Sequence, residues 1–263
     1  LCSGIRSQNV FDYEHTRRFA DYLYQTRQYS FAAEEYERAV FLNPGDSAAK
    51  ARLINTYFYL QNYNDAILQI NNMFPDSVML TSPFREKYVK LLLLNGNPGN
   101  ALNYLAVSKD TLSSFNKTYI LGCFLMQKKW ETALAFTVRN TGVDYPAYPE
   151  FKQLTMDCSR IRYKKPVIAM GLSVMIPGAG KFYTGDWEDG LVTFMIVAVN
   201  SFAAYRGFEK NGTESAFGWI YAGLAVGFYS GNIYGSFKSA RYYNKRIDRQ
   251  IYEKVDNIII SDF

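Results

Sequence analysis

The sequence predicts an all-α protein in two parts, an α-solenoid followed by a helical transmembrane hairpin. The first observation is a repeat, because alanine recurs in a similar context at separations of 34, 35 and 32 residues, at Ala32, Ala66, Ala101 and Ala133. The second is a pair of uncharged stretches in the second half, at 190–205 and 215–237. The third is composition, since 22 Tyr and 19 Phe against 8 Pro suit packed helices.

Composition excludes several function classes. The three cysteines, Cys2, Cys123 and Cys158, are far apart and show no metal-binding spacing, and His15 is the one histidine. A net charge of +5 is too weak by itself to indicate nucleic-acid binding. We therefore expect no enzyme, and no catalytic, cofactor-binding or metal-binding residues.

Composition shifts divide the chain into five segments. We expect an N-terminal tail at 1–12, a repeat domain at 13–140, a linker and helix at 141–165, a membrane module at 166–237 and a basic tail at 238–263. Because the chain begins at Leu1 and not at Met, we expect that a preceding segment was removed, either by a signal peptidase or by the choice of fragment.

The repeat has a defined internal pattern. Each recurring alanine follows an aromatic residue or a proline by three positions, at Tyr29, Tyr63, Pro98 and Trp130. Counted from Tyr13, the first unit also places Ala20 at position 8. The pattern resembles the tetratricopeptide repeat (TPR), whose period is 34 residues. The resemblance covers 13–140; it is strongest in the units that start at Tyr13 and Ser47, and weakest in the fourth.

The TPR resemblance implies a concave groove that binds extended peptides or partner helices. Family geometry would direct a mainly basic and partly aromatic set of side chains into it: Arg17, Arg18, Asp21, Arg52, Asn55, Tyr59, Lys87 and Lys90. Such a groove favours an acidic segment or a C-terminal carboxylate of a partner. The alternative is that these residues form a solvated polar face.

The uncharged stretches predict the membrane module. At about 1.5 Å per residue, 215–237 would extend about 34 Å and 190–205 about 24 Å, against a bilayer core of about 30 Å. The shorter stretch can cross if its flanking charged residues lie at the interfaces. The stretch 166–180, broken at Pro177 and Gly178, predicts a re-entrant or interfacial segment. The alternative is a buried helical pair in a soluble protein.

Glycines at every fourth position predict close helix packing, at Gly223, Gly227, Gly231 and Gly235. In water each would cost a helix about 1 kcal/mol relative to alanine, whereas in a membrane they let another helix approach closely. We expect the helix over 190–205 as the partner, with a second copy of the chain as the competing interpretation.

The glycine-rich stretch 176–190, IPGAGKFYTGDWEDG, is not a phosphate-binding loop, because Met175 replaces the required first glycine and Phe182 follows Lys181. It resembles instead the turn of small bacterial membrane hairpins of the TM2-domain kind, through Gly180, Phe182, Tyr183 and Gly185. We expect a membrane-interface turn formed by Gly178, Gly180, Lys181, Phe182, Tyr183, Gly185 and Trp187. Lys181 would pair with a nearby carboxylate or with a lipid phosphate.

The combination is similar to envelope proteins of Bacteroidota, which implies a protein integral to the bacterial inner membrane. Basic residues on both flanks of the module favour cytoplasmic termini. The absent Met, and Asp-Ser/Thr-apolar triplets at 46–48, 76–78 and 110–112 that resemble O-glycosylation sites, favour a periplasmic repeat domain. The triplets are equally ordinary helix starts. On balance we expect the periplasmic side, with the cytoplasmic side as the alternative.

These observations predict a membrane-anchored scaffold that holds another envelope or membrane protein through an acidic or C-terminal segment. The bilayer is a second partner, and a homo-oligomer is compatible with the glycine pattern. The alternative function is a lipid-handling or transport subunit that acts through its glycine-rich transmembrane hairpin.

Overall fold

A computed structural model describes residues 12–74, 80–107 and 113–263 of the chain. The protein is 82% helical, and no strand occurs in these described ranges, so the all-α prediction is confirmed. The chain forms two compact units. Unit 1 comprises Leu1–Ser159 and Glu253–Phe263, and unit 2 comprises Arg160–Tyr252. The expected tail at 1–12 lies outside the described residues except for Asp12, and two of the Asp-Ser/Thr triplets, 76–78 and 110–112, lie wholly outside them.

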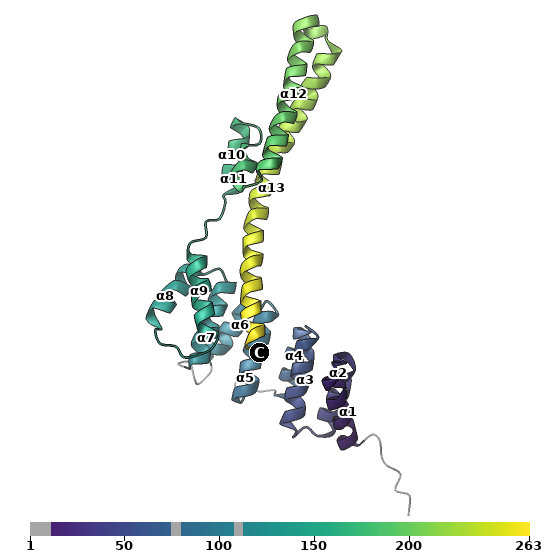
Figure 1. Ribbon diagram of the computed structural model, residues 1–263, viewed down its shortest axis with the longest axis vertical. Helices are drawn as coiled ribbons and strands as arrows, with labels where there is room; N and C mark the ends of the chain where they lie inside the picture. Colours follow the sequence, from purple (N-terminus) through teal and green to yellow (C-terminus); the bar gives the residue numbers. More distant parts are fainter. Residues whose placement is uncertain (1–11, 75–79, 108–112) are drawn as a thin grey trace, which may run out of the picture. The chain divides into compact units, whose positions relative to one another are not determined.

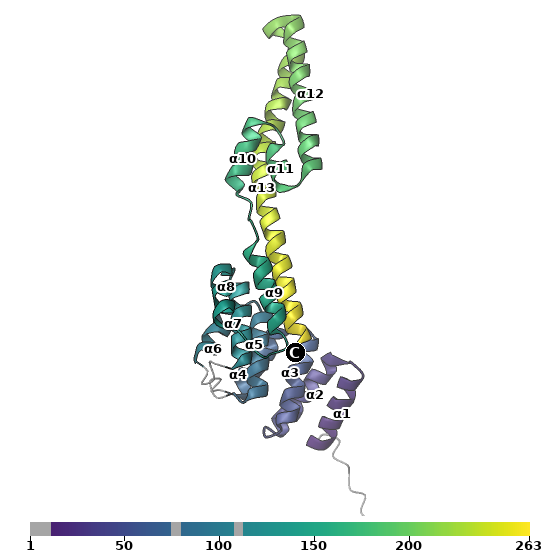
Figure 2. The ribbon, with the colours of Figure 1, turned by 60° about the vertical axis from the view of Figure 1, so that its left-hand side comes forward.

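Unit 1 begins with helices that pack in sequence order, each against its neighbours (Figures 1 and 2). Their bounds are α1 Tyr13–Gln25, α2 Tyr29–Leu42, α3 Ser47–Tyr59, α4 Tyr63–Met73, α5 Ser82–Leu94, α6 Pro98–Val107, α7 Ser114–Met126, α8 Trp130–Arg139 and α9 Tyr148–Ser159. The recurring alanines all lie in the second helix of a pair and are fully buried. Their small side chains therefore stand where two helices cross closely.

The turns within the pairs α1–α2, α3–α4, α5–α6 and α7–α8 share one geometry. Two residues before each second helix, the backbone is left-handed, at Arg27, Gln61, Gly96 and Lys128. The next N–H donates to the carbonyl five residues earlier, as from Gln28 to Leu23 and from Lys129 to Phe124. This closure satisfies carbonyls at the helix end. The fourth pair, the weakest in sequence, therefore has the same local structure as the first.

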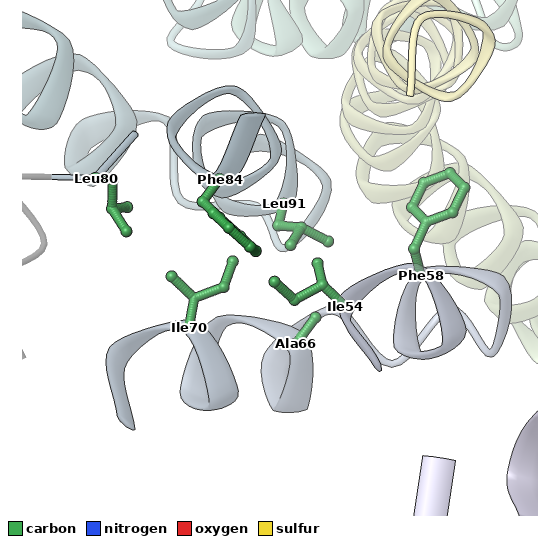
Figure 3. Packing of buried hydrophobic residues seen from close by; sticks show 7 residues of the cluster. All are labelled: Ile54, Phe58, Ala66, Ile70, Leu80, Phe84 and Leu91. Atoms are coloured by element: carbon green, nitrogen blue, oxygen red, sulfur yellow. The ribbon is translucent and has the colours of Figure 1, made fainter. Parts of the chain in front are cut away.

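Aliphatic and aromatic side chains bind the successive helices together. Ile54 of α3 and Ile70 of α4 face Phe84 and Leu91 of α5, and Ala66 lies between them (Figure 3). A second cluster joins α1, α2 and α3 through Ala20, Leu23, Ala32, Ala33, Tyr36 and Leu53. Each helix pair thus covers the apolar face of the next.

The last helix, α13, runs without interruption over Ala216–Ser261. The segment expected as a basic C-terminal tail is therefore helical almost to its end, and Glu253–Phe263 belongs to unit 1. Its apolar residues Val255, Ile258 and Ile259 are buried. Their helical spacing places them on one face, which explains why this end packs and does not remain a solvated tail.

Unit 2 holds α10 Pro166–Met175, α11 Ala179–Thr184, α12 Trp187–Asn211, the short 3-10 helix η2 Gly212–Glu214, and the preceding part of α13. The α12 helix and this part of α13 lie side by side (Figures 1 and 2). Among the described helices, one stretch, Trp187–Glu214, is long and apolar enough to cross a membrane. The expected second crossing, 215–237, does not meet that measure, because glycine, tyrosine, serine and asparagine lower its hydropathy.

The positions of unit 2 at which close backbone contact requires glycine are not those of the expected packing stripe at Gly223, Gly227, Gly231 and Gly235. A Cβ atom on Gly178 would collide with the carbonyl of Gly190, and one on Gly180 with the carbonyl of Ala169. Near the far end of α12, a Cβ on Gly207 would lie 2.7 Å from Gly218 Cα.

The expected stripe makes no comparable contact. A Cβ on Gly223, Gly227 or Gly231 would meet nothing within 4 Å among the described residues, and one on Gly235 would meet Lys181 Cε at 3.8 Å. The close approach of α12 to α13 therefore uses Gly207 and Gly218, where the backbones are nearest, and not the stripe.

The α5–α6 turn provides a stability test with a matched control. We expect Gly96→Ala to lower the free energy of unfolding by about 1–2 kcal/mol, because φ is +71° at this position. Gly99→Ala, three residues later inside α6 and with open space around its Cβ, should be neutral or stabilise by up to about 1 kcal/mol. Urea unfolding of the full chain in mild detergent measures both. Equal effects of the two changes would contradict the shared turn geometry.

A candidate protein-interaction groove

Three of the predicted groove residues converge on the end of the chain, within unit 1. The Lys90 ammonium lies 2.8 Å from Asp262 Oδ2 and donates to the Asp262 carbonyl at 2.6 Å. The Lys87 ammonium donates to Asn55 Oδ1 at 2.8 Å and lies 4.3 Å from the centre of the Phe263 ring. Two of the predicted groove residues, Lys87 and Lys90, thus contact the chain's own Phe263 and Asp262.

Two tyrosines complete the surroundings of the Asp262 carboxylate. Tyr119 and Tyr145 donate their hydroxyls to Asp262 Oδ2 at 2.5 and 2.8 Å. Burial, followed by the hydrogen bond to Asp262, raises the pKa of both phenols above the ordinary value. Since Lys90 is 5% exposed, the ion pair is largely shielded from water, which strengthens each charge-assisted hydrogen bond.

The aromatic ring that follows Asp262 has its own contact surface. The rings of Phe263 and Phe58 are stacked, with centroids 3.7 Å apart and planes 3° from parallel. Phe58 extends from α3 beside the C-terminal helix (Figure 3) and is itself part of the α3–α5 core. Burial, together with the charge of Lys90, lowers the pKa of Lys87, whose ammonium contacts the same ring.

These contacts define a site for an acidic residue followed by an aromatic one. We call it the Asp-Phe site, formed by Asn55, Phe58, Lys87, Lys90, Tyr119 and Tyr145. Its ammonium and phenol groups bind a carboxylate, and its phenyl ring and second ammonium bind an aromatic ring. In this structure the site is occupied by the chain's own Asp262 and Phe263.

The other predicted groove residues lie elsewhere in unit 1. Four of them link α1, α2 and α3 with its N-cap residue through side-chain contacts: Arg17 with Asp46, Asp21 with Tyr36 at 2.6 Å, Arg52 with the Tyr24 ring at 5.0 Å, and Tyr59 with the Tyr29 ring at 4.9 Å. Arg18 is exposed and lies 3.9 Å from Glu14, one turn earlier on the same helix. Of these five residues, Tyr59 borders the Asp-Phe site, because its ring centroid lies 5.5 Å from that of Phe58. The contacts of the other four lie within α1, α2 and the α3 region.

Sequence reasoning missed Phe58, Tyr119, Tyr145, Asp262 and Phe263. One signal was present, because the chain ends in IIISDF, an acidic–aromatic pair after an apolar run. That pair has the chemistry expected of a partner. Its connection to Lys90, 172 residues away, depends on α13 returning to unit 1, which no local pattern shows.

The docked segment also carries an unsatisfied group. Asp256 Oδ1 is buried and has no hydrogen-bond partner among the described residues. Burial, with a contribution from the nearby Glu253 charge, raises the pKa of Asp256 to about 6. The Tyr63 phenol of α4 lies close enough to interact with it electrostatically. A carboxylate with a buried, unpaired oxygen opposes docking when it is charged.

The glycine-rich turn of unit 2 reverses the chain as expected. Gly178 and Gly185 have φ of +87°, a conformation that favours glycine. The amide of Gly178 donates to Asn232 Oδ1 at 3.2 Å, and that of Gly180 to Ser173 Oγ at 2.9 Å. Within the turn, Lys181 donates to Thr193 Oγ1 at 3.1 Å.

The remaining turn residues surround this reversal. The Tyr183 hydroxyl accepts from the Lys165 amide at 3.2 Å, while Phe182 and Trp187 are exposed. Of the carboxylates expected near Lys181, Asp189 lies 3.9 Å from its ammonium. The membrane-interface role of this turn stays a prediction.

Comparisons of the chain with protein-family models, with curated proteins and with solved structures give no match in any of the three.

A double-mutant cycle tests the buried ion pair. We expect Asp262→Leu to lower the free energy of unfolding by about 3–5 kcal/mol, because Lys90 is left buried without its carboxylate. Lys90→Met should cost less, since Asp262 keeps two tyrosine donors. The double variant should be more stable than Asp262→Leu alone. Urea unfolding of the full chain in detergent measures the cycle, and additive losses would show that the pair does not couple.

The pH dependence of docking follows from Asp256. Its pKa is raised in the docked state, so docking is strongest while the carboxyl is protonated and weakens as pH rises to about 6. We expect hydrogen exchange at 253–263 to accelerate between about pH 4 and pH 6 and to level off above that range, after correction for the intrinsic pH dependence of exchange. Asp256→Asn should remove this acceleration. An unchanged pH profile in the variant would exclude Asp256 as the cause.

Proposed function

We propose that the protein is a membrane-anchored scaffold whose TPR-like α-solenoid holds an acidic–aromatic segment of another envelope protein in the Asp-Phe site. One observation carries the proposal: the site binds Asp262 and Phe263 through an ion pair, two phenol hydrogen bonds and a stacked ring. A partner segment with the same two residues would make the same contacts.

The repeat geometry supports the solenoid. Four helix pairs share one turn geometry and pack in sequence order, which supports a stacked arrangement with an extended binding surface. Residues of the site come from α3, α5 and α7, the first helices of successive pairs, and Tyr145 follows α8. This is the side from which TPR-like repeats bind peptides.

Exposed apolar side chains support the membrane anchor. Along α12 they include Val192, Phe194, Met195, Val199 and Phe202, each more than two fifths exposed. Such a surface on a helix of spanning length suits lipid. We place unit 2 in the bacterial inner membrane as a hairpin of α12 and α13, with unit 1 in the periplasm and the cytoplasm as the alternative.

The chain's own end acts as a competitor in this proposal. A partner must displace Glu253–Phe263 before it occupies the site. The unpaired Asp256 carboxylate makes that displacement easier at neutral pH, because release returns the charge to water. A partner segment with the same acidic–aromatic end and no buried charge at the equivalent position would bind more tightly than the chain's own end.

Affinity purification from native membranes, with mass spectrometry of the bound proteins, tests the scaffold. We expect Asp262→Ala combined with Phe263→Ala to increase partner capture, because the site is freed. Lys87→Glu combined with Lys90→Glu should abolish capture. Arg18→Glu is the matched control, since Arg18 is exposed and distant from the Asp-Phe site, and it should leave capture unchanged.

The direction in which partner capture changes in the Asp262→Ala/Phe263→Ala variant distinguishes a binding role of the site from a purely structural one. If the site had a purely structural role, loosening the chain's own end would lower capture or leave it unchanged. Either result, or partners that survive the Lys87 and Lys90 changes, would overturn the proposal. A peptide with the sequence of residues 253–263, added in excess, should release the captured partner from the wild-type chain.

A further inference from the structure

Unit 2 contains a pocket that the scaffold role does not use. It has a volume of about 240 Å³ and lies where α11, α12 and α13 meet. Its lining includes Lys181, Thr193 and Ile196 on one side and Gly227, Gly231 and Asn232 on the other. Two glycines of the expected packing stripe therefore form part of its wall.

An unsatisfied buried amide lies in this pocket. Asn232 is 4% exposed, and its Oδ1 accepts from the Gly178 amide at 3.2 Å. That N–H can only donate, which fixes the orientation of the side-chain amide. Asn232 Nδ2 has no hydrogen-bond partner among the described residues. Because buried amide donors are nearly always paired, this one indicates an acceptor that the described residues do not supply.

A cation lies at the same pocket. The Lys181 side chain is 19% exposed, and its ammonium donates to Thr193 Oγ1 at 3.1 Å. Thr193 donates its own proton to the Asp189 carbonyl at 2.7 Å. The nearest carboxylate, Asp189, lies 3.9 Å away and is 77% exposed, so it neutralises Lys181 weakly. An ammonium has three donors, and the pocket presents them together with the Asn232 amide.

Glycine supplies the volume of the pocket. Gly227 and Gly231 leave open space where any other residue would project a side chain. The fold of unit 2 does not need glycine there, in contrast to Gly178 and Gly180, whose Cβ atoms would collide with backbone. Helix packing within the chain gives no reason for glycine at Gly227 and Gly231. Leaving space for a ligand would give one.

We propose that this pocket binds the phosphate group of an anionic phospholipid, with Lys181 and Asn232 Nδ2 donating to its oxygens. Exposed apolar side chains of α12 around Thr193 and Ile196, namely Val192, Met195 and Val199, provide a surface for the acyl chains. The proposal rests on the membrane placement of unit 2 and is independent of the Asp-Phe site.

Retention of lipid by the purified full chain tests the site. The chain in mild detergent is supplied with phosphatidylglycerol, with phosphatidylcholine, or with inorganic phosphate, and native mass spectrometry measures what stays bound. We expect one phosphatidylglycerol to be retained at least about tenfold better than phosphatidylcholine, consistent with charge-assisted hydrogen bonds. Lys181→Met should lower this retention by about tenfold.

A matched pair of glycine variants distinguishes lipid binding in the pocket from general attraction of an anionic lipid to a basic surface. Gly231→Leu fills the pocket and should abolish selective retention. Gly223→Leu lies on the same stripe, outside the pocket and equally open, and should retain the lipid. Circular dichroism and thermal unfolding of both variants establish that each is folded.

Any other result of the lipid-retention experiment counts against a lipid site in the pocket. Equal loss in the two glycine variants, or no preference for the anionic lipid, would overturn it. Retention of inorganic phosphate without lipid preference would assign the pocket to a free anion. The Lys87→Glu/Lys90→Glu variant should keep lipid retention while it loses partner capture, so failure of the scaffold and failure of the lipid site give different results.

Discussion

The ion pair between Lys90 and Asp262 is the contact on which the arrangement of unit 1 depends. It is buried, it is completed by the hydroxyls of Tyr119 and Tyr145, and it places the Phe263 ring on Phe58. The contact joins α3, α5 and α7 through a segment that is distant in sequence. A buried ion pair of this kind specifies one arrangement more than it adds stability, since both charges lose their hydration.

The same contact links structure to the proposed function. A groove that merely carried positive charge would attract many acidic segments. The Asp-Phe site adds a stacked ring and two fixed phenols, so it selects by shape as well as by charge. Because the chain's own end meets these requirements, self-occupancy and the proposed partner capture would be two uses of one set of contacts. The buried charge of Asp256 weakens the first relative to the second.

Glycine has different roles in the two units, and the surroundings decide which. Gly96 provides a left-handed turn that Arg27, Gln61 and Lys128 adopt at equivalent positions, so the turn is set by helix pairing. Gly178 and Gly180 permit backbone contact. Gly227 and Gly231 border open volume. A spacing of four residues places glycines on one helix face, but it does not indicate what that face meets.

The sequence by itself determined the all-helical class, the helix starts at Tyr13 and Ser47, the alanine repeat and the glycine turn at 178–185. These follow from local rules, because helix periodicity, small residues at crossings and left-handed glycines act within a few residues. Tertiary structure alone decided that Lys87 and Lys90 meet the chain's own end, that Arg17 and Arg52 link helices, and that α12 meets α13 at Gly207 and Gly218. Those contacts join residues distant along the chain, so their geometry depends on how whole helices pack.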